Sequence, residues 1–373
     1  MTSIDRAAIQ NELNLKTDRI RSLLDQRGLD ALFIRRVGSF AWATCGAASH
    51  INTASSEGIA SLLVTRQGRY LLTNNIEAVR LKEEENLDEQ DWEFCISPWH
   101  SENDRLAKLT HGLKLGADGA FAGAIDLSAE LACLRSQLTS EEIRRIRTLS
   151  KLCAEGMKQA VEAAWPGMTE YQIAGLLSQA VESRGVQAIV NLIATDDRIF
   201  SFRHPLPTDK PFQRYAMLVL CGRKWGLVCS LTRLVYFSSL PDDIRRKAEA
   251  VAQVDGTMIA ATHPGSTMGD VFHQAQAAYA ATGFPDEWQH HHQGGTAGYE
   301  PREITATPSS SHPVIVGQVY AWNPSIRGVK SEDTVLVGEQ VNEVLTEMAD
   351  WPTIEVQVGS QWIKRPAILQ KDK

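Results

Sequence analysis

The pattern of apolar residues near the start of the chain predicts a helix followed by a buried strand. Leu13, Ile20 and Leu24 recur at helical spacing, and Gly28 suits the left-handed conformation that ends many helices. The apolar run 31–34 follows and has the length of a short strand. Further on, the apolar runs 59–64 and 70–73 predict a hairpin because a polar, glycine-containing segment separates them. The first part of the chain is therefore expected to be a small α/β domain.

A second domain is predicted to begin near residue 138. Thr139 and Glu142 have the spacing of a capping box, in which each side chain binds the backbone N–H of the other residue. Apolar residues then keep helical spacing up to Pro166, which cannot continue a helix: Ile146, Cys153, Met157, Ala160 and Ala164. This start divides the chain into expected domains of residues 1–137 and 138–373.

The second domain contains an internal repeat. Residues 165–170 read Trp-Pro-Gly-Met-Thr-Glu and open a predicted helix that ends at Gly185. Residues 263–268 read His-Pro-Gly-Ser-Thr-Met and open another predicted helix that ends at Gly283. Because self-similarity at this scale indicates a repeated structural unit, we expect two related halves.

Composition narrows the classes of function. A length of 373 residues favours two domains, and a net charge of −7 without a basic run argues against binding nucleic acid. The chain has no apolar run of membrane-spanning length and no signal-peptide pattern at its start. Its six cysteines are scattered without paired spacing, which is typical of reduced thiols. We expect a cytoplasmic protein that binds neither nucleic acid nor membrane.

Four short motifs follow one another in the C-terminal half. They read GLVCSLTR at 226–233, HHHQGGTAGY at 290–299, AWNP at 321–324 and KSEDTVLV at 330–337. In this order they resemble the metal-binding framework of the creatinase/prolidase/aminopeptidase P family. The resemblance implies an α+β fold, with a creatinase-like N-terminal domain and a "pita-bread" catalytic domain of two pseudo-twofold halves. It also implies a homodimer.

Most of the metal ligands of that family are replaced in this chain. The family usually holds two divalent ions with two Asp, one His and two Glu. By resemblance, the five ligand positions hold Val219, Ser230, His292, Asn323 and Glu332. Ions such as Mn²⁺ favour several carboxylates, whereas Val219 has no donor atom and Ser230 and Asn323 offer neutral oxygens. We therefore expect no cofactor and no two-metal site.

A second alignment of the first motif is possible. Shifting it by two residues puts Cys221 at the first ligand position. The resulting set of Cys, Ser, His, Asn and Glu is better suited to one zinc ion, because thiolate and imidazole are zinc ligands. The alternative role for Cys221 or Cys229, near a histidine, is that of a nucleophile. Cysteines on strands are more often inert packing residues.

His204 is the candidate general acid/base. It resembles the substrate-facing histidine of the family, which in creatinase transfers protons in a reaction without metal. Because imidazole titrates near neutrality, one group can take a proton from water and return it to a leaving nitrogen. The alternative is a loop histidine that only binds backbone.

The run 290–292 consists of three histidines at an expected strand end. On a strand, His290 and His292 share one face and His291 points away. His292 then forms a pocket wall, although the run can also be an exposed turn. Tyr299 stands where the family has its second histidine, which puts peptide-like substrate anchoring in doubt.

Glu332 and Asp333 are expected to face opposite sides of a strand, with Glu332 in the pocket. A buried carboxylate needs a raised pKa or a cationic partner, for which Arg233 and Lys330 are the candidates. The alternative for Glu332 is a solvated surface charge. For Arg203, one interpretation is that it binds a substrate carboxylate, and the alternative is that it is an ordinary exposed arginine. The candidate substrate-binding residues are Arg203, Arg233, His290, Tyr299 and Asn323, beside the catalytic set His204, His292 and Glu332.

The function expected from these residues is metal-independent hydrolysis of a C–N bond in a small nitrogenous compound. His204 is the acid/base, and Glu332 and His292 orient water or substrate. One alternative is an Xaa-Pro-type aminopeptidase or dipeptidase with a remodelled metal site. Another is a non-catalytic protein that binds a small molecule in the same pocket.

Overall fold

In this computed structural model, which describes residues 3–101 and 104–372, the chain divides into two units. The first comprises residues 1–142 and 225–227, and the second comprises 143–224 and 228–373. The division falls inside helix α6 (Ser140–Ala163), shortly after helix α5 (Ser128–Ser136). The boundary expected at 137/138 lies in the connection between these two helices.

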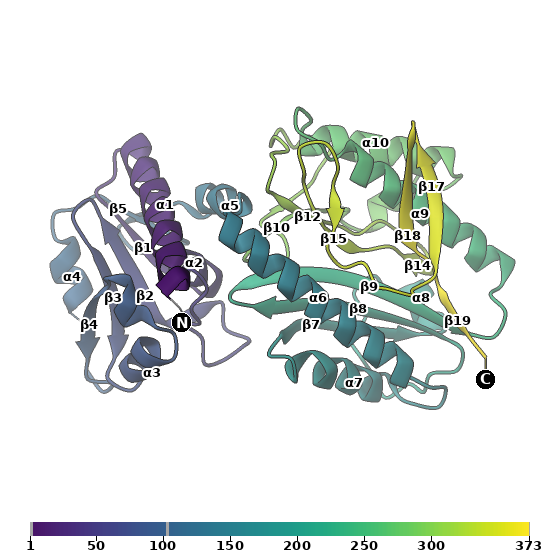
Figure 1. Ribbon diagram of the computed structural model, residues 1–373, viewed down its shortest axis with the longest axis horizontal. Helices are drawn as coiled ribbons and strands as arrows, with labels where there is room; N and C mark the ends of the chain where they lie inside the picture. Colours follow the sequence, from purple (N-terminus) through teal and green to yellow (C-terminus); the bar gives the residue numbers. More distant parts are fainter. Residues whose placement is uncertain (1–2, 102–103, 373) are drawn as a thin grey trace. The chain divides into compact units, whose positions relative to one another are not determined.

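A six-stranded mixed sheet in the order β4-β3-β2-β1-β5-β6 forms the centre of the first unit (Figure 1). Its strands are β1 (Ala31–Arg36), β2 (Glu57–Thr65), β3 (Arg69–Asn74), β4 (Glu93–Ser97), β5 (Leu115–Ala117) and β6 (Ala124–Asp126). Besides α5, the helical segments are α1 (Ser3–Arg27), α2 (Val37–Ala43), α3 (Ala78–Glu83), η1 (Leu87–Gln90) and α4 (Arg105–Thr110). The predicted helix stop at Gly28 has φ +65°, and the predicted hairpin is formed by β2 and β3.

Two sheets organise the second unit. One has the order β19-β9-β8-β7, and the other has the order β11-β10-β12-β15-β16. The strands of the first sheet are β7 (Gln187–Thr195), β8 (Tyr215–Lys224), β9 (Leu227–Phe237) and β19 (Leu369–Lys371). Those of the second are β10 (Gly294–Ala297), β11 (Ile304–Thr305), β12 (Val319–Trp322), β15 (Asp333–Leu336) and β16 (Glu343–Val344).

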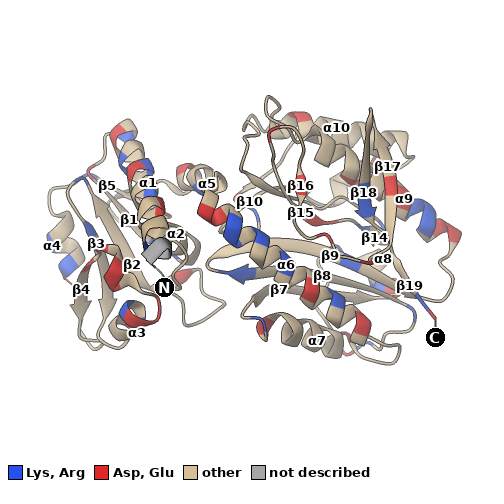
Figure 2. Ribbon diagram, in the orientation of Figure 1, with Lys and Arg blue, Asp and Glu red and all other residues tan. Residues whose placement is uncertain are grey.

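The remaining elements of the second unit are helices and two short hairpins. The helical segments are α7 (Glu170–Glu182), α8 (Asp197–Ser201), α9 (Asp242–Ala261), α10 (Met268–Ala281) and η2 (Glu287–His290). The hairpins pair β13 (Ser325–Ile326) with β14 (Val329–Lys330) and β17 (Thr353–Val358) with β18 (Gln361–Pro366). Figure 2 shows acidic and basic residues side by side along α6 and α9. Among the described residues, no helix combines the length and hydropathy needed to span a bilayer.

The internal repeat is visible in the way α7 and α10 begin. Each helix has a threonine N-cap, Thr169 or Thr267, whose side chain completes a capping box with the third helical residue. Each threonine also forms an isolated bridge to a proline, Pro211 or Pro313. The two helices thus begin in equivalent surroundings, and each is followed by a glycine of positive φ, at +70° and +87°. The repeat predicted from the sequence is confirmed at this local level.

The core of the second unit joins both sheets and two helices. One buried cluster contains Leu192 and Val219 from the first sheet, Tyr320 and Trp322 from the second, and residues of α9 and α10. Packing of this kind fixes the two sheets against each other, because close-packed interiors tolerate few voids. The polar side chains described next lie at the edge of this core.

Candidate active site

The candidate site lies where β9 meets the segment that leads into β15. Thr232 and Glu332 form an isolated antiparallel bridge, with the Thr232 backbone N–H donating to the Glu332 carbonyl at 3.1 Å. The Ser230 backbone N–H donates to Thr334 Oγ1 at 2.8 Å, and that hydroxyl donates to the Ser230 carbonyl at 2.9 Å. These bonds connect the two sheets and hold Ser230 and Glu332 at neighbouring places.

Glu332 is buried and held by two cations. Lys330 Nζ lies 2.7 Å from Glu332 Oε2, and Arg302 Nη2 donates to Oε1 at 2.9 Å. The Thr232 hydroxyl donates to Oε2 at 2.7 Å. Burial alone would raise the pKa of Glu332, but Lys330, Arg302 and Thr232 outweigh it and hold that pKa at about 2. Glu332 is therefore a carboxylate at neutral pH, and Lys330 is the partner that the sequence predicted.

Arg302 contacts Ser230 and Glu332, two residues that resemble metal ligands in the sequence motifs, although nothing in those motifs indicated Arg302 itself. Its guanidinium lies 3.4 Å from Ser230 Oγ through Nη1, besides its contact with Glu332 through Nη2. A divalent ion shared by positions 230 and 332 would need the oxygens that Arg302 contacts. Arg302 thus places its guanidinium charge beside both residues.

Cys221, rather than Val219, lies beside Ser230. The Ser230 hydroxyl donates to Cys221 Sγ at 3.2 Å. Val219 belongs to the hydrophobic cluster and pairs with Leu192 on β7. This contact favours the alternative alignment with Cys221 at the first position, and the assignment of either Val219 or Cys221 to a ligand position stays a prediction. Burial raises the pKa of the Cys221 thiol to about 11, so the thiol is protonated at neutral pH.

A two-metal centre does not fit these residues. The donor set is a thiol, a hydroxyl, an amide, the His292 imidazole and one carboxylate already paired with two cations. Asn323 is buried, and its Oδ1 has no hydrogen-bond partner among the described residues. A single neutral amide oxygen cannot replace the carboxylates that two hard ions require.

Three histidines form a cluster next to this ion-paired group. His204 follows α8, and its Nε2 lies 3.0 Å from His291 Nε2. The His291 ring stacks on that of His292 at a centroid distance of 4.4 Å, and His292 lies 5.6 Å from His204. The sequence expectation that His291 points away is therefore wrong.

His290 lies outside this cluster because the local backbone is not a strand. It is exposed at the end of η2, whereas β10 begins only at Gly294. The alternation expected of a strand therefore does not apply to the histidine run. His291, and not His290, joins His292 in the cluster.

All three clustered histidines are neutral at pH 7. Burial, then the nearby Lys330, lowers the pKa of His291 to about 2. Burial, then Arg302, lowers the pKa of His292 to about 4. The pKa of His204 is lowered by the same two kinds of cause. Each ring therefore carries one nitrogen lone pair that can accept a proton or bind a metal ion.

Arg203 lies near the cluster but is already paired. Its Nη2 lies 2.5 Å from Glu287 Oε2. With His291, Ser325 and Lys330, it lines a cavity of about 10 Å³. A space of that size holds roughly one water molecule. The expected role of Arg203 in binding a substrate carboxylate stays a prediction.

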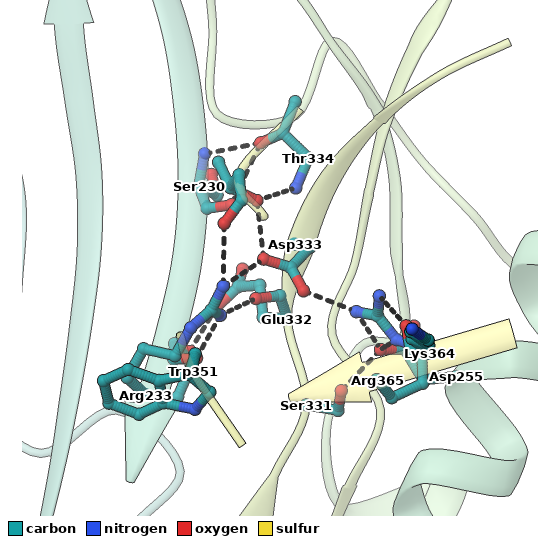
Figure 3. Close-up of polar contacts among 12 residues, drawn as sticks. Ser230, Arg233, Asp255, Ser331, Glu332, Asp333, Thr334, Trp351, Lys364 and Arg365 are labelled. Atoms are coloured by element: carbon teal, nitrogen blue, oxygen red, sulfur yellow. Dashed lines mark hydrogen bonds and ion pairs between the residues drawn. The ribbon is translucent and has the colours of Figure 1, made fainter. Parts of the chain in front are cut away.

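Arg233 has a structural environment. Its Nη2 contacts Asp333 Oδ1 at 2.8 Å and the Thr346 carbonyl at 2.8 Å. Asp333 also accepts from Arg365 at 2.6 Å, and Arg365 contacts Asp255 on α9 at 2.7 Å (Figure 3). The side chains of Glu332 and Asp333 therefore bind different partners, as the sequence predicted. Arg233, however, pairs with the carboxylate of Asp333 and not with that of Glu332.

The other candidates are buried in the protein. Tyr299 is 2% exposed, and its backbone N–H donates to Glu303 Oε1 at 2.8 Å. Cys229 is fully buried and contacts Cys153 on α6, which agrees with a packing role.

A cavity of about 750 Å³ lies apart from the candidate site. It is lined by residues that include Arg233, Asp333, Trp351, Trp362 and Arg365, and its lining includes neither Glu332 nor the clustered histidines.

Comparisons with known proteins agree with this architecture. A family model described as metallopeptidase family M24 matches residues 144–339, more than half of the 373 residues. An uncharacterized peptidase from Staphylococcus aureus (strain MW2) is 25% identical over 263 residues, which cover 68% of this chain and 73% of that protein.

Two solved structures show the same fold. The prolidase from Pyrococcus horikoshii OT3 matches with a TM-score of 0.77 and 19% identity, covering 89% of this chain and 98% of its own. The Xaa-Pro dipeptidase from Bacillus anthracis matches with a TM-score of 0.77 and 17% identity, covering 90% and 98%. These likenesses confirm the fold class predicted from the sequence motifs.

Proposed function

Because this chain belongs to metallopeptidase family M24, a family of hydrolases, we propose that it hydrolyses a C–N bond in a small nitrogenous compound without a two-metal centre. His204 is the general acid/base of this reaction. His291 and His292 orient His204 and the substrate. Glu332 does not act as a base, because its pKa is about 2 and both of its oxygens are occupied.

The observation that carries the proposal is the pair of cations on Glu332. Arg302 and Lys330 lie 2.9 and 2.7 Å from its carboxylate oxygens, and Arg302 also approaches Ser230. Their two charges exceed the single charge of Glu332, so the pocket keeps a net positive charge that stabilises negative charge on a substrate. A metal ion would do the same as a Lewis acid.

The proton transfers follow from the position of His204. A water molecule attacks the electrophilic carbon while His204 accepts a proton from it, forming a C–O bond. The same imidazolium then donates that proton to the nitrogen, and the C–N bond breaks. Since the Nε2 atoms of His204 and His291 face each other, one ring donates an N–H hydrogen bond to the other in the resting state. A substrate must displace this contact before His204 can accept a proton.

Turnover of a panel of small C–N compounds, including Xaa-Pro dipeptides, tests the proposal. We expect turnover that persists in chelator and falls about 10²–10⁴-fold in His204→Ala. His273→Ala is the matched control, because His273 is an exposed histidine on α10, and it should keep the parent rate. A His204→Ala rate above a third of the parent rate would contradict the assignment of His204.

The same panel separates the alternatives. Two equivalents of Mn, Co or Zn by elemental analysis, with metal-dependent hydrolysis of Xaa-Pro dipeptides, would replace the proposal with a remodelled peptidase. The names of the two solved structures give this alternative its support. Saturable binding without turnover of any compound would instead indicate a binding protein on this fold.

A further inference from the structure

The three clustered histidines have the arrangement of ligands around one metal ion. Each of His204, His291 and His292 offers a ring nitrogen, and these nitrogens all lie within 4.8 Å of one another. The shortest separation, between His204 Nε2 and His291 Nε2, is 3.0 Å. In a tetrahedral zinc site with bonds of about 2.0–2.1 Å, neighbouring nitrogens are about 3.3 Å apart. Binding an ion would require the longest of these separations to shorten, and His204 and His292 are the exposed members whose rings would rotate.

From this geometry we propose that His204, His291 and His292 form a site for one divalent cation of the zinc class. Imidazole nitrogens suit Zn²⁺, Co²⁺ and Cu²⁺, whereas Mn²⁺ and Mg²⁺ favour carboxylate oxygens. The site shares only His292 with the positions that resemble two-metal ligands, and it uses none of Ser230, Cys221, Asn323 or Glu332. His204 and His292 are exposed, so water or an anion can reach the cluster as a further ligand.

The surroundings set a limit on affinity. Lys330 and Arg302 carry positive charge next to the cluster, and Glu332 carries the only opposing charge among the groups that act on these rings. His291 Nδ1 is buried and finds no hydrogen-bond partner within the described part of the chain, although metal-binding histidines usually donate from their second nitrogen. A dissociation constant on the order of micromolar is therefore expected, weaker than in a closed structural site.

Metal binding at this site would oppose the hydrolysis. This consequence rests on the proposed function: an ion bound to His204 occupies the nitrogen lone pair that His204 needs in order to accept a proton. The same three residues then serve either as acid/base machinery or as a metal site, and zinc acts as an inhibitor.

Titration of the full-length chain with Co²⁺ tests the site independently of activity. We expect one equivalent to bind, with visible absorption bands of a four-coordinate nitrogen site. His291→Ala and His292→Ala should each weaken binding at least about 30-fold, in line with the loss of one of three ligands. His290→Ala is the matched control and should change affinity less than about 3-fold, because His290 is exposed and outside the cluster. Cys133→Ser should also bind normally, which tests for capture by the exposed thiol.

Several outcomes would overturn the site. They are unchanged binding in His291→Ala, loss of binding in His290→Ala, or no saturable binding by the parent chain. His291→Asn, checked by circular dichroism, replaces His291→Ala if the latter does not fold. Once a substrate is known, inhibition by Zn²⁺ supports both the site and the proposed hydrolysis. Binding with activation supports the site and overturns the metal-independent reaction.

Discussion

At position 332, the chain keeps a carboxylate that resembles a metal ligand and surrounds it with its own cations. Lys330 lies two residues away along the chain, so the sequence alone could identify it as a partner. Arg302 lies 30 residues from Glu332 and 72 from Ser230, and only the folded chain brings these three together. Side-chain chemistry at a motif can be predicted from sequence, whereas a partner from a distant loop cannot.

Replacing Glu332 with Gln should destabilise the protein in a pH-dependent way. At pH 7 the change leaves Lys330 and Arg302 without their countercharge, at a cost of about 3–5 kcal/mol in the free energy of unfolding. The folded pKa of about 2 lies below the ordinary value of 4.5, so Glu332 stabilises the fold above pH 4.5. This contribution is lost as the pH falls towards 2. The stability difference between parent and variant should therefore narrow below pH 4.5.

Denaturant unfolding of both proteins at several pH values between 3 and 7 measures this difference. Glu355→Gln is the matched control, because Glu355 is 58% exposed and lies 3.9 Å from Lys364. Its effect should stay within about 0.5 kcal/mol at every pH. A stability difference for Glu332→Gln that is constant across this range would contradict a depressed pKa.

Among the elements, β10 shows how backbone geometry decides which histidine enters the site. The sequence places the histidine run at a strand end, but η2 ends at His290 and β10 begins at Gly294. The intervening residues turn, so strand alternation fails there. Gly294 and Gly295 begin the strand with φ of +105° and +156° and lie close to the carbonyls of neighbouring strands.

Gly295→Ala should disrupt this strand. A Cβ at position 295 would lie 2.0 Å from the Ile304 carbonyl oxygen, and the backbone there cannot move freely between β11 and β12. The expected loss is about 3 kcal/mol or more. Gly175→Ala is the control, because Gly175 lies within α7 with no atom near its Cβ position. That change should stabilise the protein by up to about 1 kcal/mol. Thermal unfolding measures both, and a Gly295→Ala protein as stable as the parent would contradict the close approach.

For the whole molecule, the order of motifs and the internal repeat were enough to predict the fold. Thr169 and Thr267 carry local capping signals that sequence reasoning can read, and both caps are present. The contact between Cys221 and Ser230 could not be predicted from sequence, because it depends on which residue of β8 lies beside Ser230 on β9. The homodimer and the domain boundary at 137/138 stay predictions.

Mn²⁺ should not stabilise this protein, although it would stabilise one that binds it in a two-metal centre. A ligand that binds only the folded state raises the unfolding temperature, and one without a site does not. We expect about 1 mM Mn²⁺ to shift that temperature by less than about 1 °C. Differential scanning calorimetry measures the shift, with NaCl at equal ionic strength as the control. A rise of more than about 3 °C would restore the two-metal interpretation.

The buried chain of Asp255, Arg365, Asp333 and Arg233 has a consequence for how this protein can change by mutation. Its charges alternate in sign and sum to zero, so any single replacement with a neutral residue leaves one buried charge unbalanced. A variant that has lost one of these four charges is therefore unstable. These four positions can change only in pairs that remove or exchange one positive and one negative charge together. The neighbouring hydroxyl and thiol of Ser230 and Cys221 carry no such charge, so they can be exchanged one step at a time.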